Sequence, residues 1–119
     1  MKDNIVQRKS FEFALETIEL YRQLVNEREY VLSKQLLRSG TSIGANIEEA
    51  TAAQSRKDFV HKMAIASKEA RETQYWIRLL IASNITKIDM SESLVRANEL
   101  VKLLTAIVKS TSNESRPSH

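Results

Sequence analysis

Glycine and proline are scarce in this chain of 119 residues, which contains two glycines and one proline. Both residue types are needed for the tight turns that connect the strands of β-sandwiches and β-barrels. Their scarcity therefore nearly excludes an all-β fold and favours long helices joined by few connections. Hydrophobic residues make up 42% of the chain, which is enough for one small core.

Four segments show the 3.6-residue periodicity of amphipathic helices. Short connections between long helices are typical of an antiparallel, up-and-down four-helix bundle. We therefore predict an all-α fold with one domain over residues 1–110. Ser55 precedes Asp58 by three positions and resembles a capping box at the start of the third segment. The predicted helices cover about residues 10–26, 30–52, 56–83 and 90–110, and the polar residues 111–119 are expected to form a disordered tail.

The first and third predicted helices each carry apolar residues on two separated faces. In the first, we expect the stripe through Phe11, Leu15 and Ile18 to face the bundle core. The other face would then be exposed in a single chain, which favours a homo-oligomer. The alternative is that wide apolar stripes contact two neighbours within one bundle. The residues predicted for the oligomer interface are Phe13, Leu20, Leu24, Ile65, Trp76 and Leu79.

Charge and cysteine content restrict the partners and the kinds of site that the chain can have. The net charge is +3, a mild basic excess that permits anionic partners without requiring them. The absence of cysteine removes disulfides, thiolate metal sites and cysteine nucleophiles. No apolar run is long enough for a signal peptide or a membrane span, so we expect a cytoplasmic protein that does not contact membranes.

The histidines do not favour a metal site. Di-iron bundles use two Glu-x-x-His motifs and further glutamates, whereas this chain has one Asp58-x-x-His61 and places His119 in the tail. No nucleophile with a nearby base can be named either. We therefore predict no metal, no cofactor and no enzymatic activity.

The most unusual stretch is the one around Gly40 and Gly44, which lie four residues apart within a predicted helix. Each glycine weakens a helix by about 1 kcal/mol relative to alanine. We interpret them as positions where another backbone approaches closely. Polar residues surround them and recur on the third helix, and they predict a structural hydrogen-bond network or, alternatively, a polar ligand pocket. These residues are Arg38, Ser42, Asn46, Glu49, Glu69 and Glu72.

Basic residues concentrate on one side of the third predicted helix. Residues 55–83 contain six basic and three acidic residues, an excess equal to the net charge of the chain. Five of the six fall within an arc of about 120° in helical projection. Such an arc suits a phosphate backbone, or else it is simply a solvated face. Tyr75 is the one aromatic residue within the arc, so the sequence gives base stacking little support. The five residues are Arg56, Lys57, Lys68, Arg71 and Arg78.

The run over residues 35–50 (QLLRSGTSIGANIEEA) resembles the signature of the four-helix-bundle family named for the 23S ribosomal RNA intervening-sequence protein. Asp58-Phe59, residues 64–73 (AIASKEARET) and Tyr75-Trp76 also match in type and spacing. The resemblance extends over about residues 8–108. Ala50 stands where the family often has an alanine or glycine after the acid.

The resemblance implies an up-and-down bundle that assembles into a ring, with a pentamer as the expected size. It implies no catalytic residues, because the family has none established. Members are encoded within insertions in 23S rRNA genes or stand alone in bacterial genomes. The bundle also resembles the accessory protein of diversity-generating retroelements, a pentamer that binds nucleic acid and a reverse transcriptase.

Taken together, we expect a bacterial homo-oligomer that binds RNA or DNA through the basic arc without catalysis. The alternative is a protein–protein adaptor whose basic arc is only solvated. A third hypothesis, an enzyme built on Asn46, Glu49, Glu69 and Glu72, has the weakest basis in the sequence.

Overall fold

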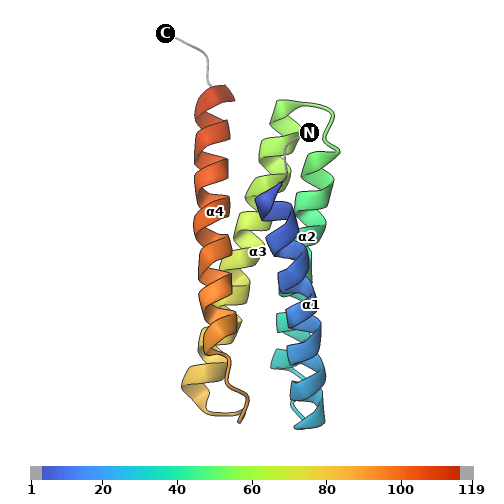
Figure 1. The fold of residues 1–119 in the computed structure, drawn as a ribbon, viewed down its shortest axis with the longest axis vertical. Helices are drawn as coiled ribbons and strands as arrows, with labels where there is room; N and C mark the ends of the chain where they lie inside the picture. Colours follow the sequence, from blue (N-terminus) through green and yellow to red (C-terminus); the bar gives the residue numbers. More distant parts are fainter. Residues whose placement is uncertain (1–3, 116–119) are drawn as a thin grey trace.

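The protein is a bundle of four helices (Figure 1). A computed structural model describes the backbone of residues 4–115 and the side chains of residues 4–112. No strand occurs within this part of the chain, so the all-α prediction is confirmed. None of its helices is apolar over a length sufficient to cross a membrane. The helices are α1 (Ile5–Asn26), α2 (Leu32–Thr51), α3 (Arg56–Ser83) and α4 (Ser91–Ser115).

Two helix ends differ by five residues from the sequence-based prediction, and the others agree within two. α1 begins at Ile5, five residues early, because the Asn4 side chain accepts the amide N–H of Gln7 at 3.0 Å and caps the helix. α4 continues to Ser115, so the prediction of disorder is wrong for residues 111–115. In this last stretch the Thr111 hydroxyl donates to the Ile107 carbonyl at 2.7 Å, a contact within the helix that polarity alone did not reveal. Residues 116–119 lie outside the described part of the chain.

Side chains near the connections fix the other helix starts. The Ser55 hydroxyl accepts the Asp58 amide N–H at 3.1 Å, as the capping motif predicted. At α2, the Glu29 carboxylate accepts the amide N–H groups of Val31, Leu32 and Ser33. One carboxylate thus satisfies three donors at a helix start, where the helix dipole also favours negative charge.

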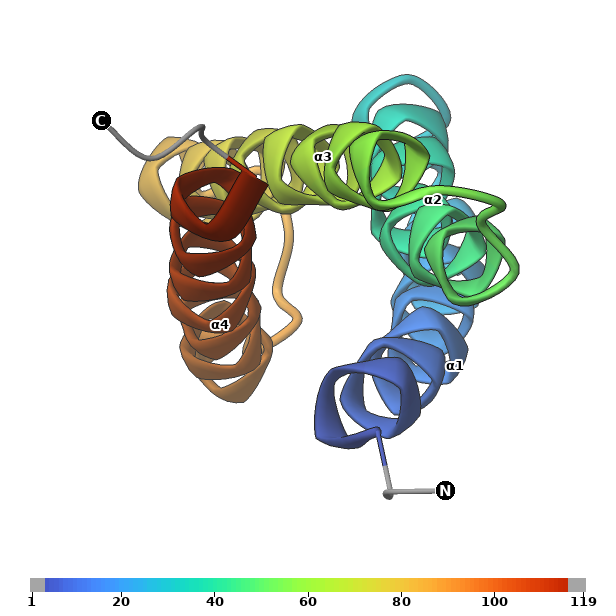
Figure 2. The same ribbon diagram turned by 90° about the horizontal axis from the view of Figure 1, so that it is seen from above.

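Consecutive helices are neighbours around the bundle. α1 packs on α2, α2 on α3 and α3 on α4, whereas α1 and α4 contact each other least. Figure 2 shows the C-terminal end of α4 lying apart from α1. Polar contacts join the two helices where they approach: Arg96 bonds to Glu16 at 3.1 Å, and Lys9 pairs with Glu99 at 3.1 Å. The bundle is therefore held by three extensive helix interfaces and a fourth, smaller one.

The core lies along the axis of the bundle. On α3 it contains an apolar stripe with heptad-like spacing, whose residues Met63, Ala66, Ala70, Ile77 and Leu80 are buried. The other helices contribute Leu, Ile and Phe side chains that are almost fully buried. Among them are Phe13, Leu24, Leu36, Ile43, Ile47, Leu100 and Leu104.

Candidate functional site

The basic face of α3, defined as Arg56, Lys57, Lys68, Arg71 and Arg78, points to solvent. All five side chains are exposed, because the heptad stripe of α3 turns the opposite side of the helix toward the core. Tyr75 lies within this face and is 51% exposed. At the start of α3, Arg56 and Lys57 border a surface hollow of about 440 Å³ with Ser112 of α4. The structure thus keeps the five predicted residues on one accessible surface.

Four charges of this face, those of Lys57, Lys68, Arg71 and Arg78, are available to an external anion. Within the described residues no ion pair holds Lys57, Lys68, Arg71 or Arg78. Arg71 donates instead to the neutral Ser67 hydroxyl, at 2.9 Å. If the chain's own carboxylates neutralised these cations, the cations would no longer attract phosphate. The described contacts include no such ion pair.

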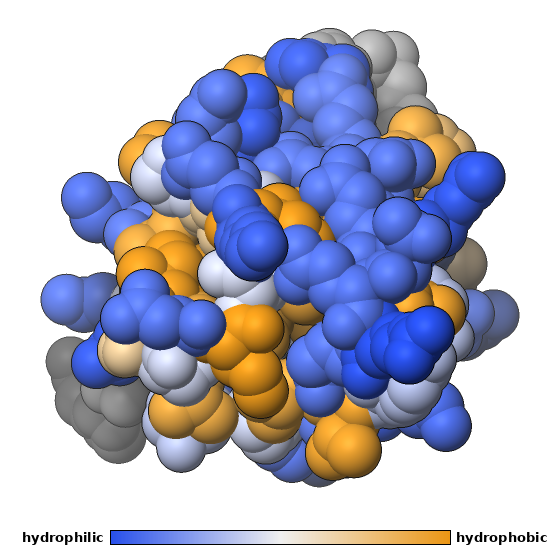
Figure 3. Space-filling model, turned by 90° about the horizontal axis from the view of Figure 1, so that it is seen from below, coloured by the Kyte–Doolittle hydropathy of each residue, from blue (hydrophilic) through white to orange (hydrophobic). Residues whose placement is uncertain are grey.

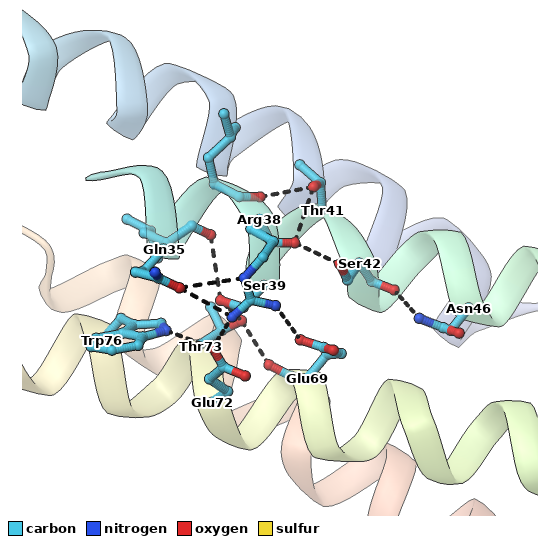
Figure 4. A network of polar contacts seen from close by, with 12 residues as sticks. Gln35, Arg38, Ser39, Thr41, Ser42, Asn46, Glu69, Glu72, Thr73 and Trp76 are labelled. Atoms are coloured by element: carbon cyan, nitrogen blue, oxygen red, sulfur yellow. Dashed lines mark hydrogen bonds and ion pairs between the residues drawn. The ribbon is translucent and has the colours of Figure 1, made fainter. Parts of the chain in front are cut away.

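A polar network connects α2 with α3 (Figure 4). Arg38 reaches from α2 to Glu69 at 3.3 Å and to Glu72, both on α3. Gln35, one turn before Arg38, accepts from the same guanidinium at 3.3 Å. The Trp76 indole N–H donates to the Glu72 carboxylate at 3.0 Å. Arg38 is 47% exposed while the Glu69 side chain is 14% exposed, so the network reaches from the surface into the α2–α3 interface.

A second polar contact between α2 and α3 is buried. The hydroxyl oxygens of Ser39 and Thr73 are 2.8 Å apart, and both residues are buried. Thr73 also bonds to the Glu69 carbonyl of its own helix. No buried side-chain nitrogen or oxygen in the described structure lacks a hydrogen-bond partner. A network satisfied in this way fixes the register of α2 against α3.

The structure brings together only part of the predicted polar cluster. Arg38, Glu69 and Glu72 meet, whereas Ser42 and Asn46 bond to carbonyls of their own helix, those of Arg38 and Ser42. Glu49 is exposed and stands outside the network. Four further residues of the network were not predicted from the sequence. Each is polar or aromatic and lies one helical turn from a predicted member, which was the available signal. These residues are Gln35, Ser39, Thr73 and Trp76.

The prediction for the outward face of α1 is wrong. Phe13, Leu20 and Leu24 are buried in the core of the single chain, so they do not form an exposed interface. Their stripe continues through Ser10 and Thr17, two small polar residues that lie against the glycines of α2. Because this side lets α1 approach α2 closely, it faces inward. On α3, Ile65, Trp76 and Leu79 are partly buried, and their role in an oligomer stays a prediction.

The exposed apolar face of α1 is instead the stripe through Phe11, Leu15 and Ile18. Together with Ala14 and the small residues of α2 it lines a groove of about 730 Å³. Arg8, Glu12 and Glu48 place charges along the same groove. By contrast, at the end that carries the α1–α2 and α3–α4 connections, hydrophobic side chains occur as separate patches among polar ones (Figure 3).

Metal-binding groups are absent from the described part of the chain, where no three His, Asp or Glu side chains gather to hold an ion. His61 is exposed on α3. Glu69 and Glu72 both pair with the Arg38 guanidinium.

Comparisons with known proteins agree with this architecture. The family model of the 23S rRNA-intervening sequence protein matches residues 2–106. A crystal structure of a protein of unknown function from the S23 ribosomal protein family of Bacteroides thetaiotaomicron is 52% identical. The match covers 88% of this chain and 99% of that one, with a TM-score of 0.83. The comparison with curated proteins gives no significant match. The chain therefore belongs to the family of the 23S rRNA-intervening sequence protein.

Proposed function

We propose that this protein is a non-catalytic homo-oligomer that binds RNA or DNA through the basic face of α3. The observation that carries the proposal is that cations of this face are exposed and are not paired with carboxylates. Lys57, Lys68, Arg71 and Arg78 are exposed and lack an ion-pair partner within residues 4–112. Arg38 and Arg96, in contrast, are each bridged by two carboxylates.

The length of the face suits a nucleic-acid backbone. From Lys57 to Arg78 the helix rises about 30 Å, which is long enough to lie along several successive phosphates of one strand. Each phosphate contact releases counterions, so binding weakens with salt. Four contacts give a slope near −3 in log Kobs against log salt for a single strand. The family name, which refers to 23S rRNA, is compatible with an RNA partner.

Self-association is proposed through the groove of α1 and α2. Phe11, Leu15 and Ile18 form a contiguous apolar stripe that the single chain leaves exposed. Such stripes on small soluble proteins commonly mark an interface. A contact between this groove and a different surface of the next copy would be heterologous, and it closes into a ring when the rotation allows. A ring would repeat the basic face around its circumference.

The same groove supports the second candidate, a protein–protein adaptor. In that case a different protein covers Phe11, Leu15 and Ile18, and the basic face of α3 is solvated. The two candidates differ in one observable, the affinity for nucleic acid at low salt.

A titration of labelled RNA and DNA at about 50 and 200 mM salt tests the proposal. We expect binding that weakens steeply with salt and is lost in the Arg71→Glu/Arg78→Glu variant. The matched control is Arg22→Glu/Lys34→Glu, which makes the same change in net charge at exposed positions on α1 and α2. Absence of binding at low salt would overturn nucleic-acid binding and leave the adaptor. Equal weakening in both variants would show that the basic face of α3 is not the site.

A further inference from the structure

Tyr75 holds a particular position on the basic face of α3. It lies one helical turn from both Arg71 and Arg78, at spacings of four and three residues that place side chains next to each other. Its side chain is 51% exposed. A half-exposed aromatic ring therefore lies between two cations that have no carboxylate partner in the described structure.

The ring of Tyr75 is braced from the side of the bundle. It packs edge-to-face on Trp76, with ring centroids 5.2 Å apart and an angle of 65° between the planes. Trp76 in turn donates to Glu72, which Arg38 holds from α2. A sequence of contacts thus leads from Arg38 through Glu72 and Trp76 to Tyr75. Such support restricts an exposed side chain before any ligand binds, and that lowers the entropy lost on binding.

We infer that Tyr75 is a stacking platform for a base of an unpaired nucleic-acid strand whose phosphates lie on Arg71, Arg78 and Lys68. This inference rests on the proposed function and specifies its ligand as single-stranded. In a duplex both faces of each base are covered by its neighbours in the stack, so an exposed tyrosine on a helix has no base face to contact. Proteins that bind single strands combine a positive track with aromatic side chains on which bases stack.

The test compares one oligonucleotide sequence as a single strand of RNA, a single strand of DNA, a duplex and an abasic strand that keeps the phosphates. Fluorescence of Trp76, the one tryptophan of the chain, reports binding next to Tyr75. We expect single strands to bind more tightly than the duplex and the abasic strand. The RNA and DNA arms show whether the ribose contributes.

Three variants isolate the ring of Tyr75. Tyr75→Leu keeps an apolar side chain but removes the π face, and should weaken single-strand binding by about 5- to 150-fold. The abasic strand and the duplex should bind this variant as they bind the original chain. Tyr75→Phe should keep single-strand binding. Tyr30→Ala, which removes a tyrosine that is 52% exposed on the α1–α2 connection, should change nothing.

The possible results separate the two proposals. Equal binding of single strand and duplex, or Tyr75→Leu binding single strands like the original chain, overturns the stacking inference and leaves the basic face as a phosphate site. Loss of affinity in Tyr75→Leu for the abasic strand as well would also overturn it, because the effect would not depend on a base. Failure of every oligonucleotide to bind at low salt overturns the proposed function itself. Circular dichroism of each variant verifies the helical fold.

Discussion

Gly40 of α2 lies directly against Thr17 of α1. A Cβ atom at Gly40 would stand 2.6 Å from Thr17 Cγ2, 2.7 Å from its Oγ1 and 3.1 Å from its Cβ. Both side-chain branches of Thr17 therefore face the glycine, and the Thr17 hydroxyl is held by the Phe13 carbonyl at 2.8 Å. This contact sets how closely the first two helices approach, and it explains a glycine in the middle of a helix.

Gly40→Ala should destabilise the protein. The added methyl group has no room, because both branches of Thr17 face it and rotation about χ1 leaves the Thr17 Cβ at 3.1 Å. Overpacking of this kind costs about 1–3 kcal/mol, against about 1 kcal/mol gained from the better helix propensity of alanine. Urea denaturation should therefore give a lower unfolding free energy. Stability equal to or above that of the original chain would contradict the close approach.

Gly44→Ala is the matched substitution, four residues along the same helix. There the nearest atoms to an added Cβ belong to Ser10, and the shortest distance is 3.4 Å, an ordinary contact. The propensity gain of about 1 kcal/mol should therefore dominate, and stability should rise or stay level. A double-mutant cycle of Gly40→Ala with Thr17→Ala should show a favourable coupling, while Gly44→Ala with Thr17→Ala should be close to additive.

The same contacts explain how far the sequence could predict the fold. The number and type of helices follow from periodicity and from the scarcity of glycine and proline, and both glycines were identified as contact positions. The inward face of α1 was assigned wrongly because Ser10 and Thr17 interrupt the buried stripe with hydroxyl groups. Judged by hydrophobicity alone, the stripe through Phe11, Leu15 and Ile18 is as suitable for the core as the buried stripe, or more so. The choice between the two faces depends on the fit to α2, which is a property of two helices together.

Phe11 and Phe13 should respond in opposite ways to truncation. Phe13 is 2% exposed and Phe11 is 64% exposed, although they are two residues apart. Phe13→Ala should lower the unfolding free energy by about 3–5 kcal/mol. Phe11→Ser should change it by no more than about 0.5 kcal/mol at dilutions where the chains are separate. Chemical denaturation of both variants measures this contrast.

Substitution of Phe11 should also affect self-association if the protein forms the proposed oligomer. Light scattering over a concentration series should show association of the original chain and its loss in Phe11→Glu/Leu15→Glu. Val95→Glu, at another exposed apolar position on α4, should leave association intact. A monomer at all concentrations would argue against self-association, and equal disruption by Val95→Glu would place the interface elsewhere.

Asp89 gives the protein a defined acid dependence at the start of α4. The backbone amide of Ser91, and next its hydroxyl, donate to the Asp89 carboxylate at 3.0 and 2.7 Å and lower its pKa below the ordinary 3.8. Its contribution to stability is therefore present above the unfolded-state pKa and is lost as the pH falls through the lower folded-state pKa. NMR titration of the carboxyl carbon should give a midpoint below 3.8. In Ser91→Ala the midpoint should rise only part of the way, because the backbone hydrogen bond, the larger cause of the lowered pKa, remains.

The polar network was partly predictable. Arg38, Glu69 and Glu72 were identified because charged residues of opposite sign lay on two helices expected to be neighbours. Trp76 was assigned to an oligomer interface instead, since its apolar area dominates any sequence pattern. Its indole N–H has a partner only because Glu72 lies four residues earlier on the same helix and is held there by Arg38. A link of three residues on two helices depends on their register, which periodicity does not specify.

Removal of Arg38 tests whether the network positions Trp76. Arg38→Met keeps the length of the side chain but leaves Glu69 and Glu72 without their cation, at a cost of about 1 kcal/mol for a half-exposed pair. Trp76 fluorescence should shift to longer wavelength, because Glu72 no longer holds the indole against the bundle. Arg38→Lys should give an intermediate shift, since an ammonium group cannot bond to both carboxylates with the geometry of a guanidinium.

Arg96→Met is the control for Arg38→Met. Arg96 is as exposed as Arg38 and is bridged by Glu16 and Glu92, but it contacts α1 rather than Trp76. It should cost similar stability and leave the Trp76 emission unchanged. If both variants shifted the emission equally, the change would report general loosening of the bundle. If neither variant shifted the emission, Glu72 would not position Trp76. The ring of Tyr75 would then be supported by its contact with Trp76 alone.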